Sequence, residues 1–521
     1  MKSYGYYLFS LKKTVKISCM KSFLITILVL VLVFNAKSQT NKDSAYCDEC
    51  VSFDQLWSAE VISASRKIQK KNEAAGSVIV ITADIISKRG YRTLEEVLED
   101  VPGIDFTTRQ PEGEYPAHFI SRGITDVGQT NMLIIVDGVI RNDVSNGWMR
   151  HTGFDFPLID VDRIEVIFGP GSALYGANAY AGIIYIVTKN AYEIARKRQI
   201  ESRVSYGANN TVSPELYYSA KFKNSLRLQA SGQWYFTEGD GGAGRFDPGN
   251  YFHNNYEPDS VLTTEYGRIV NEKDSSGKTK KLPDGFNNSI NDMHFKFLAN
   301  HGNFTLGMSY SLRNEGLGSE VVGYEYFANT DGIAYRAMHS GKTFFTKYEF
   351  DLNKKLHSLS LFSYRNTRIL PQTSFLYTYQ YQSVNNGIDS AVDDKLKAYF
   401  GDGSAIRFEQ QFNYNISRYN ELIFGFHVEN QTRQYFGISL GDAPGKGSTI
   451  IVSTYPHGKM SVIPVYYSSN FSLYAQDEFR FLKNYVITAG LRYDYDLDFG
   501  GVFIPRIAFV ANPHKQLFIK Y

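Results

Sequence analysis

Alternation of apolar and polar residues dominates the chain from about residue 201 to its end. In LRLQASGQWYF, residues 226–236, Leu226 and every second residue after it are apolar or small. YVITAGLRYDY, residues 485–495, repeats the pattern, and IRFEQQFNY and ELIFGFHVE are similar. Segments of about ten residues with a period of two are typical of strands that cross a membrane in a β-barrel. A soluble sandwich also alternates, but the number of such segments, with aromatic residues at their ends, favours the barrel.

The connections between these segments support the same fold class. Short turns join some pairs, at 300–303, 352–356, 415–420 and 482–485. Long, polar, Gly-rich stretches separate the resulting hairpins, at 237–291, 314–341, 367–404 and 431–470. Outer-membrane barrels have short periplasmic turns and longer extracellular loops, whereas compact domains rarely contain such long loops.

Composition agrees with a membrane barrel and excludes other classes. The 521 residues include 38 Tyr and 36 Phe but only 3 Trp, and aromatic girdles are a feature of barrels. The formal net charge of +2 gives no electrostatic footprint for nucleic acid. Beyond the N-terminus, the chain has no apolar run long enough for a transmembrane helix, so any membrane crossing is made by strands.

The N-terminus has the pattern of a secretory signal. Met20 is followed by Lys21 and an apolar run, Phe23–Phe34, which is too short to span a bilayer. Ala36-Lys37-Ser38 fits a cleavage site, which predicts an N-terminal extension plus signal peptide over 1–38. A membrane anchor is the alternative. Met20 is the expected start rather than Met1, although the sequence leaves both open.

Three cysteines occur in the chain. Cys19 would be removed with the signal, and Cys47 and Cys50 form the short motif CDEC. In an exported chain this spacing predicts a local disulfide. Metal binding is the alternative, but a second pair of ligands for zinc is missing.

Residues 77–190 read as a small mixed α/β domain. SVIVIT, residues 77–82, is predicted to be a buried strand, and TLEEVLEDVPG a helix that ends at Pro102-Gly103. Thr93 and Glu96 form a capping box. Leu94, Val97, Leu98 and Val101 have the spacing of one apolar helix face. MLIIVDGVIRND predicts two strands around an Asp137-Gly138 turn, and RIEVIF and GIIYIVTK two more strands.

The Gly-rich stretch RIEVIFGPGSALYGANAYAGIIYIVTK, residues 163–189, could be taken for a phosphate-binding loop. A P-loop requires Lys followed by Ser or Thr, and no Lys follows Gly176. A dinucleotide fingerprint requires a third Gly after Gly169 and Gly171, and Leu174 occupies that position. Both nucleotide interpretations are therefore excluded.

This stretch instead resembles the end of the plug domain of TonB-dependent outer-membrane receptors. TLEEVLEDVPGIDF, FISRGI and MLIIVDGV match three further plug motifs in the same order. Two positions depart from the family pattern, with Phe168 in place of the usual Arg and Tyr185 in place of a frequent Asn. The resemblance implies a periplasmic segment with a TonB box over 39–76, a plug domain over 77–195 and a barrel over 201–521.

The resemblance also gives the plug motif residues a structural role. Their glycines would allow tight turns and close approach of the plug to the barrel wall, and Arg122 is a candidate for an ion pair that anchors the plug. The motif residues are Arg122, Gly123, Asp137, Gly138, Gly169, Pro170, Gly171 and Gly176.

Upstream of the plug, WSAEVISASRK lies where the family has a short extended segment that pairs with the periplasmic protein TonB. Such pairing would be β-augmentation, in which main-chain hydrogen bonds supply the affinity. An ordinary linker strand is the alternative. The expected TonB box is Glu60, Val61, Ile62, Ser63, Ala64 and Ser65.

The resemblance implies TonB-dependent active uptake of a siderophore or similar metal chelate across the cell outer membrane. The expected partners are TonB, outer-membrane lipid and the small-molecule chelate. No nucleic acid, resident cofactor, bound metal or catalytic residue is expected. Polar plug loops would contact the ligand, with solvated loops as the alternative. The candidate contacts are Arg109, Tyr115, Arg141, Trp148, Arg150 and His151.

Alternatives to uptake are a ligand-sensing receptor, a passive porin, an exported enzyme and a non-functional receptor fragment. The porin is disfavoured by the plug motifs, and the enzyme by the lack of a G-x-S-x-G or H-E-x-x-H motif. About 13 candidate strands follow residue 201, whereas barrels of this kind have about 22. The sequence thus predicts a truncated barrel with exposed sheet edges. Ferric siderophore, haem, cobalamin and oligosaccharide all remain open as ligands.

Overall fold

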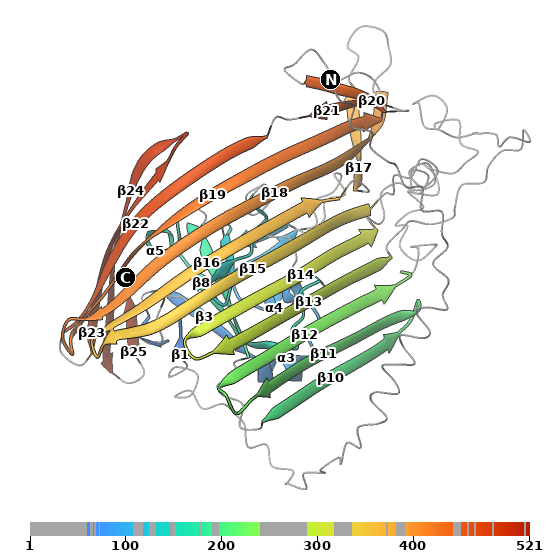
Figure 1. The fold of residues 1–521 in the computed structure, drawn as a ribbon. Helices are drawn as coiled ribbons and strands as arrows, with labels where there is room; N and C mark the ends of the chain where they lie inside the picture. Colours follow the sequence, from blue (N-terminus) through green and yellow to red (C-terminus); the bar gives the residue numbers. More distant parts are fainter. Residues whose placement is uncertain are drawn as a thin grey trace, which may run out of the picture. The chain divides into compact units, whose positions relative to one another are not determined.

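The structure is a computed structural model that contains a small N-terminal α/β domain and a large antiparallel sheet (Figure 1). The residues it describes are 60–62, 66, 69–71, 73–74, 76–107, 118–123, 132–145, 147, 153, 155–169, 171–176, 179–189, 197–239, 289–316, 336–370, 373–381, 391–440, 450–455, 458–462, 465–481, 484–514 and 517–521.

The N-terminal domain, which is the expected plug domain, is built on a five-stranded sheet. Its strand order is β3-β8-β9-β6-β7, and only the β6–β9 pair is parallel. All of the strands predicted here are present. Their bounds are β3 (Ser77–Thr82), β8 (Val161–Phe168), β9 (Gly182–Thr188), β6 (Met132–Val136) and β7 (Val139–Ile140). Two separate antiparallel pairs are β1 (Glu60–Val61) with β2 (Gln69–Lys70) and β4 (Ile104–Thr107) with β5 (His118–Ser121).

The described helices are α3 (Ala83–Arg89), α4 (Leu94–Glu99) and α5 (Ser172–Tyr175). Helix α4 begins where the capping box predicts, because the Thr93 side chain accepts a hydrogen bond from the Glu96 N–H at 3.1 Å. The Glu96 carboxylate accepts from the Arg92 N–H at 2.6 Å, one residue before the expected partner. The helix ends at Glu99, slightly before the predicted Pro-Gly end.

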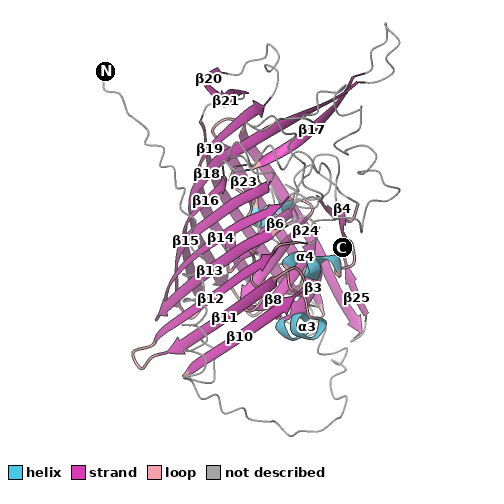
Figure 2. Ribbon diagram, turned by 90° about the vertical axis from the view of Figure 1, so that its right-hand side faces the viewer, coloured by secondary structure: helices cyan, strands magenta, loops and turns pink. Residues whose placement is uncertain are grey.

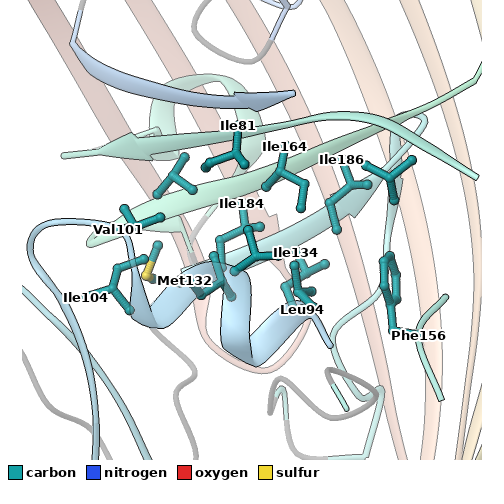
Figure 3. Close-up of a cluster of buried hydrophobic side chains, with 14 of the residues drawn as sticks. Ile81, Leu94, Val101, Ile104, Met132, Ile134, Phe156, Ile164, Ile184 and Ile186 are labelled. Carbon is teal, nitrogen blue, oxygen red and sulfur yellow. The ribbon is translucent and has the colours of Figure 1, made fainter. Parts of the chain in front are cut away.

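The core of the plug domain lies between its sheet and helix α4 (Figure 3). Leu94, Val97 and Leu98 are buried as the helix pattern predicts, and Val101, just past the helix, is buried with them. They pack with sheet residues such as Ile184. Every member of this cluster comes from residues 81–186, so this core is complete without the large sheet.

The large sheet, here called the wall sheet, has 16 strands, 13 of which follow one another in a single antiparallel path (Figures 1 and 2). Within the described residues, β10 at one end pairs only with β11, and β25 at the other pairs only with β24. The path consists of β10 (Arg198–Gly207), β11 (Thr211–Lys221), β12 (Leu226–Thr237), β13 (Ile290–His301), β14 (Phe304–Gly316), β15 (Arg336–Asn353), β16 (Leu356–Ile369), β18 (Ala391–Asn415), β19 (Asn420–Leu440), β22 (Tyr466–Phe481), β23 (Tyr485–Asp496), β24 (Gly500–His514) and β25 (Leu517–Lys520).

The wall sheet buries its polar face and exposes its apolar face. On β12, Gln229, Ser231 and Gln233 are buried, while the apolar residues between them are only half-buried. On β23, Leu491 is 50% exposed and the neighbouring Arg492 is 1% exposed. This distribution is the reverse of a water-soluble sheet and agrees with a polar lumen and a lipid-facing exterior.

Three of the predicted short turns, at 300–303, 352–356 and 415–420, lie where the sequence predicts them, and residues 482–483 of the fourth lie outside the described residues. The predicted long connections are partly wrong. Residues 391–404 and 431–440, which the sequence assigns to loops, belong to β18 and β19; residues 396–404 pair with 432–440, and 391–395 pair with a further strand. The predicted loops also contain β17 (Ser374–Tyr381) and the β20–β21 hairpin (Ile450–Tyr455 and Gly458–Val462). Polar residues are common in these strand segments. Backbone pairing continues in them because the hydrogen bonds between strands do not depend on an apolar face.

Two further findings concern the termini and membrane crossing. Among the described residues, no helix is both long and apolar enough to cross a bilayer. The predicted signal peptide, Cys47 and Cys50 lie outside the described residues.

Candidate functional site

The plug domain contacts the polar face of the wall sheet, and three of the seven described motif residues, Asp137, Gly138 and Gly176, lie at these contacts. The Asp137-Gly138 turn is one such place. Asp137 has a left-handed backbone with φ of 51°, and its carboxylate accepts from the Thr188 N–H at 2.9 Å and the Thr188 hydroxyl at 2.7 Å. From the wall, the Lys296 Nζ lies 3.2 Å from the same carboxylate.

Lys296 joins two plug carboxylates. Its Nζ is 3.3 Å from an Asp160 oxygen, which also accepts from the Ser231 hydroxyl at 2.9 Å. Burial alone would raise the pKa of Asp137, but Lys296 and the Thr188 hydrogen bonds outweigh it and hold the pKa below its usual range. Ser231 of β12 and Lys296 of β13 thus bind the two carboxylates on one side of the plug.

The Gly-rich stretch forms helix α5 and its flanking turns. A Cβ at Gly171 would overlap the Ile183 side chain, so only glycine fits without a shift. Gly176 has φ of +101°, and a Cβ there would lie 3.3 Å from an Arg492 nitrogen of the wall. Gly169 also has a positive φ, of 104°, and Pro170 lies outside the described residues. Gly169 and Gly176 thus have backbone conformations that favour glycine.

The ion pair predicted for Arg122 stays a prediction. Among the described residues Arg122 forms no ion pair, and its guanidinium lies over the Phe168 ring at 4.5 Å. Its N–H donates to the Gly103 carbonyl at 2.7 Å, and both Arg122 and Gly123 have positive φ. Phe168, the departure from the family pattern, is therefore the ring on which Arg122 stacks.

The expected TonB box is described only in part. Glu60 and Val61 form β1, and Val61 is fully buried. The Ile62 N–H donates to the Glu165 carboxylate at 2.9 Å. The rest of the segment, 63–65, lies outside the described residues.

Arg66, just after this segment, is the contact that sequence reasoning missed. Its guanidinium pairs with the Glu409 carboxylate of β18 and donates to the Tyr474 hydroxyl at 3.1 Å. It lies over the Tyr175 ring of α5 at 4.4 Å and the Tyr474 ring at 5.0 Å. Burial alone would lower the pKa of Arg66, but Glu409 raises it above its usual range. A single basic residue in a linker carries no signal for such a contact.

A polar cavity of about 240 Å³ lies between the plug and the wall. On the plug side it is bounded by β6, β7, residues 142–144, Gly147 and the end of α5, and on the wall side by β16, β18, β19, β22 and β23. Its charged and imidazole groups are Asp143, Arg365, Arg407, His427, Glu429, Arg433, Arg492, Asp494 and Asp496.

Next to this cavity, the plug backbone lies against the wall. The Val144 N–H and the Asp143 carboxylate both bond the Thr367 hydroxyl, each at 2.9 Å. A Cβ at Gly403 would lie 2.6 Å from the Ser145 nitrogen. Gly403 therefore permits a close approach that the sequence alone does not identify.

One predicted ligand contact is described, and it faces the wall. Arg141 donates to the Ser309 and Thr343 hydroxyls, both at 2.6 Å, which makes it a plug–wall contact. Burial lowers the pKa of Arg141 to about 10, so it stays charged at neutral pH. The other five candidates, Arg109, Tyr115, Trp148, Arg150 and His151, lie outside the described residues.

Comparison with protein families finds two matches along the chain. The family model described as TonB-dependent Receptor Plug Domain matches residues 70–183. The model described as TonB dependent receptor-like, beta-barrel, matches residues 278–521. Together the two models cover more than half of the chain.

Curated relatives include a vitamin B12 transporter of Vibrio vulnificus, 33% identical over 181 residues, which are 34% of this chain and 28% of that protein. A ferric enterobactin receptor of Pseudomonas aeruginosa is 32% identical over 172 residues, 29% of this chain and 23% of that protein. The matched part of the chain thus spans about a quarter of these relatives.

Solved structures share the fold. The siderophore receptor PiuA of Acinetobacter baumannii aligns with a TM-score of 0.58 at 14% identity, over 89% of this chain and 66% of that one. A variant of the ferric enterobactin receptor PfeA of Pseudomonas aeruginosa aligns with a TM-score of 0.54 at 17% identity, over 86% of this chain and 62% of that one.

Proposed function

Since the chain belongs to the TonB-dependent receptor family, we propose that it takes part in active uptake of a siderophore or similar metal chelate across the cell outer membrane. Receptors of this family bind small ligands and interact with TonB. The siderophore, enterobactin and vitamin B12 receptors among the similar proteins support a metal chelate as the ligand class.

The observation that carries the proposal is the position of a folded plug against the polar face of a sheet whose other face is apolar. The wall contacts of Lys296, Arg492 and Thr367 fix this plug. A plug that blocks a polar lumen makes passive diffusion slow, so transport requires movement of the plug. A ligand that binds two states of the plug with equal affinity does not change their populations. Movement of the plug therefore requires an external source of energy.

TonB, in this proposal, engages residues 60–65 as an added β-strand. The antiparallel pairing of Glu60 and Val61 with β2 supports the capacity of this segment for strand pairing. The ligand is proposed to contact Arg109, Tyr115, Trp148, Arg150 and His151, because cationic and aromatic groups suit an anionic ferric chelate.

Uptake of a radiolabelled ferric siderophore by cells that express the chain tests the proposal. We expect uptake that a proton uncoupler abolishes. Val61→Pro removes a backbone donor from the box and should lower uptake at least tenfold, whereas Val61→Ala should lower it far less. Uptake that continues unchanged with the uncoupler would refute active transport.

A further inference from the structure

The cavity between the plug and the wall has a charged lining, and most of that charge is neutralised within the protein. Arg365 pairs with Glu429 at 3.1 Å, and Arg407 reaches the same carboxylate at 3.5 Å. Arg407 also pairs with Glu409 at 2.9 Å. None of these side chains is more than 9% exposed. An anion that entered the cavity would have to displace a carboxylate that already occupies each of these two guanidinium groups.

The next two lining residues add no available positive charge. Arg492 pairs with Asp494 at 2.7 Å, and one of its nitrogens lies 3.4 Å from the His427 Nδ1. A guanidinium group can only donate, so this Nδ1 accepts and carries no proton. The proton of the ring is then on Nε2, which lies 3.1 Å from the Asn470 side-chain oxygen. The imidazole is therefore neutral, and the lining is not a general anion site.

Two lining residues, Arg433 and Asp496, have no ionic partner in the part of the chain that the structure describes. The Arg433 guanidinium donates to the Gln431 side-chain oxygen at 3.1 Å. The Asp496 carboxylate accepts from the Ser468 hydroxyl at 3.1 Å and from the Asp498 N–H at 2.9 Å. Both residues are half-buried and border the cavity. Each retains a full charge that is available to a ligand group of opposite sign.

The spacing of these two charges and the size of the cavity limit what can bind. Arg433 belongs to β19 and Asp496 to β23, with β22 between them. Two strand spacings thus separate their backbones by about 10 Å across the sheet. Pockets that enclose a drug-sized ligand measure about 300–1,000 Å³, whereas this cavity measures about 240 Å³. It has room for one arm of a metal chelate and not for the whole molecule.

We infer that the cavity is a subsite for a zwitterionic arm of the cargo, in which Arg433 binds a carboxylate and Asp496 binds an ammonium group. The two charges of the arm are several ångströms apart, as in an acylated lysine. A purely anionic arm meets one available cation and one carboxylate that repels it. This inference rests on the proposed function, because it names the part of the transported chelate that the cavity selects.

Protection of a cavity thiol by small analogues of the arm tests the subsite without a metal and without uptake. In the purified full chain, Cys19, Cys47 and Cys50 are replaced by Ser, and Ile140→Cys places a single thiol in the cavity lining. Nα-acetyl-lysine has both charges, Nα-acetyl-norleucine lacks the ammonium group, and N-acetylcadaverine lacks the carboxylate. We expect Nα-acetyl-lysine to halve the labelling rate at a concentration at least tenfold lower than either of the other two.

Two substitutions assign the charges. Arg433→Gln should make Nα-acetyl-lysine no better than N-acetylcadaverine, because the carboxylate has lost its partner. Asp496→Asn should make it no better than Nα-acetyl-norleucine, because the ammonium group has lost its partner. Arg418→Gln, in the short turn at 416–419, is the control and should keep the tenfold preference. The labelling rate without an analogue shows whether each variant keeps the fold around the cavity.

Equal concentrations for all three analogues, or strongest protection by Nα-acetyl-norleucine, would overturn the subsite. A preference for Nα-acetyl-lysine that survives both substitutions would overturn it as well. The proposed function is decided separately, by uptake of the radiolabelled ferric siderophore. Selective protection of the thiol without energy-dependent uptake would refute transport and support the subsite, whereas uptake without selective protection would have the opposite meaning.

Discussion

Arg492 of wall strand β23 donates a hydrogen bond to the carbonyl oxygen of Leu174 in plug helix α5, at 3.3 Å. The last carbonyls of a helix have no partner within it, and here the wall supplies one. Arg492 also bonds Asp494 at 2.7 Å and the Ser472 hydroxyl at 2.8 Å. One buried guanidinium therefore couples the Gly-rich stretch to two wall strands.

Arg492→Met should lower the stability of the folded chain by about 3 kcal/mol, because it leaves the partner carboxylate of Asp494 buried without a cation. Arg433→Met is the control, since Arg433 donates only to Gln431 among the described residues, and it should cost less than about 1 kcal/mol. Urea unfolding of the detergent-solubilised protein measures both. If both substitutions lowered the free energy of unfolding by the same amount, Arg492 would not be an anchor of α5.

Asp137→Asn should make the fold less sensitive to acid. The folded-state pKa of Asp137 is lower than its unfolded value, so ionised Asp137 stabilises the fold above about pH 4, the ordinary Asp pKa. That contribution decreases as pH falls through the folded-state pKa. The variant should be less stable than the parent at pH 7, with a difference that shrinks toward pH 3. Asp84→Asn, at an exposed ion pair, should show little difference at either pH.

Gly182→Ala should disrupt the plug sheet. A Cβ at this position would overlap the Ile167 carbonyl oxygen and lie 2.9 Å from the Met132 methyl carbon. Overpacking of this kind costs about 1–3 kcal/mol. At Gly232, on the wall, the nearest atom to such a Cβ is 3.4 Å away, so Gly232→Ala should cost less. Pulse proteolysis measures the stability of the two variants. A Gly182→Ala variant as stable as the parent would contradict the tight β8–β9 contact.

Leu491→Arg should impair membrane insertion. Leu491 is half exposed on the apolar face of β23, and a cation near the bilayer midplane costs about 2–4 kcal/mol. Leu491→Ala is the control and should insert nearly as well as the parent. Folding yield into lipid vesicles measures insertion. Equal yields for the two variants would argue that this face does not meet lipid.

Much of the fold could be predicted from the sequence because the relevant signals are local. The period of two in β12 and β23 and the apolar face of Leu94, Val97 and Leu98 are properties of neighbouring residues. The strand count of about 13 and the short turns at 300–303, 352–356 and 415–420 are confirmed. The sequence predicts loops over residues 396–404 of β18 and 432–440 of β19, because polar composition does not show that backbone pairing continues there.

The plug–wall contacts could not be predicted in the same way. Arg66 and Glu409 are 343 positions apart, and nothing near either residue indicates the other. The close approach of Gly403 to Ser145 is a property of two backbones, which no residue pattern records. Arg122 lies over the Phe168 ring, 46 positions later in the chain, and no pattern near either residue indicates this contact.

The apolar core around Leu94 and Ile184 contains only residues 81–186, and this has a consequence for biogenesis. These residues are synthesised before any strand of the wall sheet. The face of the sheet that packs on α4 therefore has its apolar partners within the domain at that stage, whereas the opposite face, with Leu133 and Ile183, is completed only by Ile423 and Tyr474 of the wall. Assembly with the wall sheet then brings together both polar groups and the apolar side chains of this second face, so a displacement of the plug from the wall would leave the core around Leu94 and Ile184 intact.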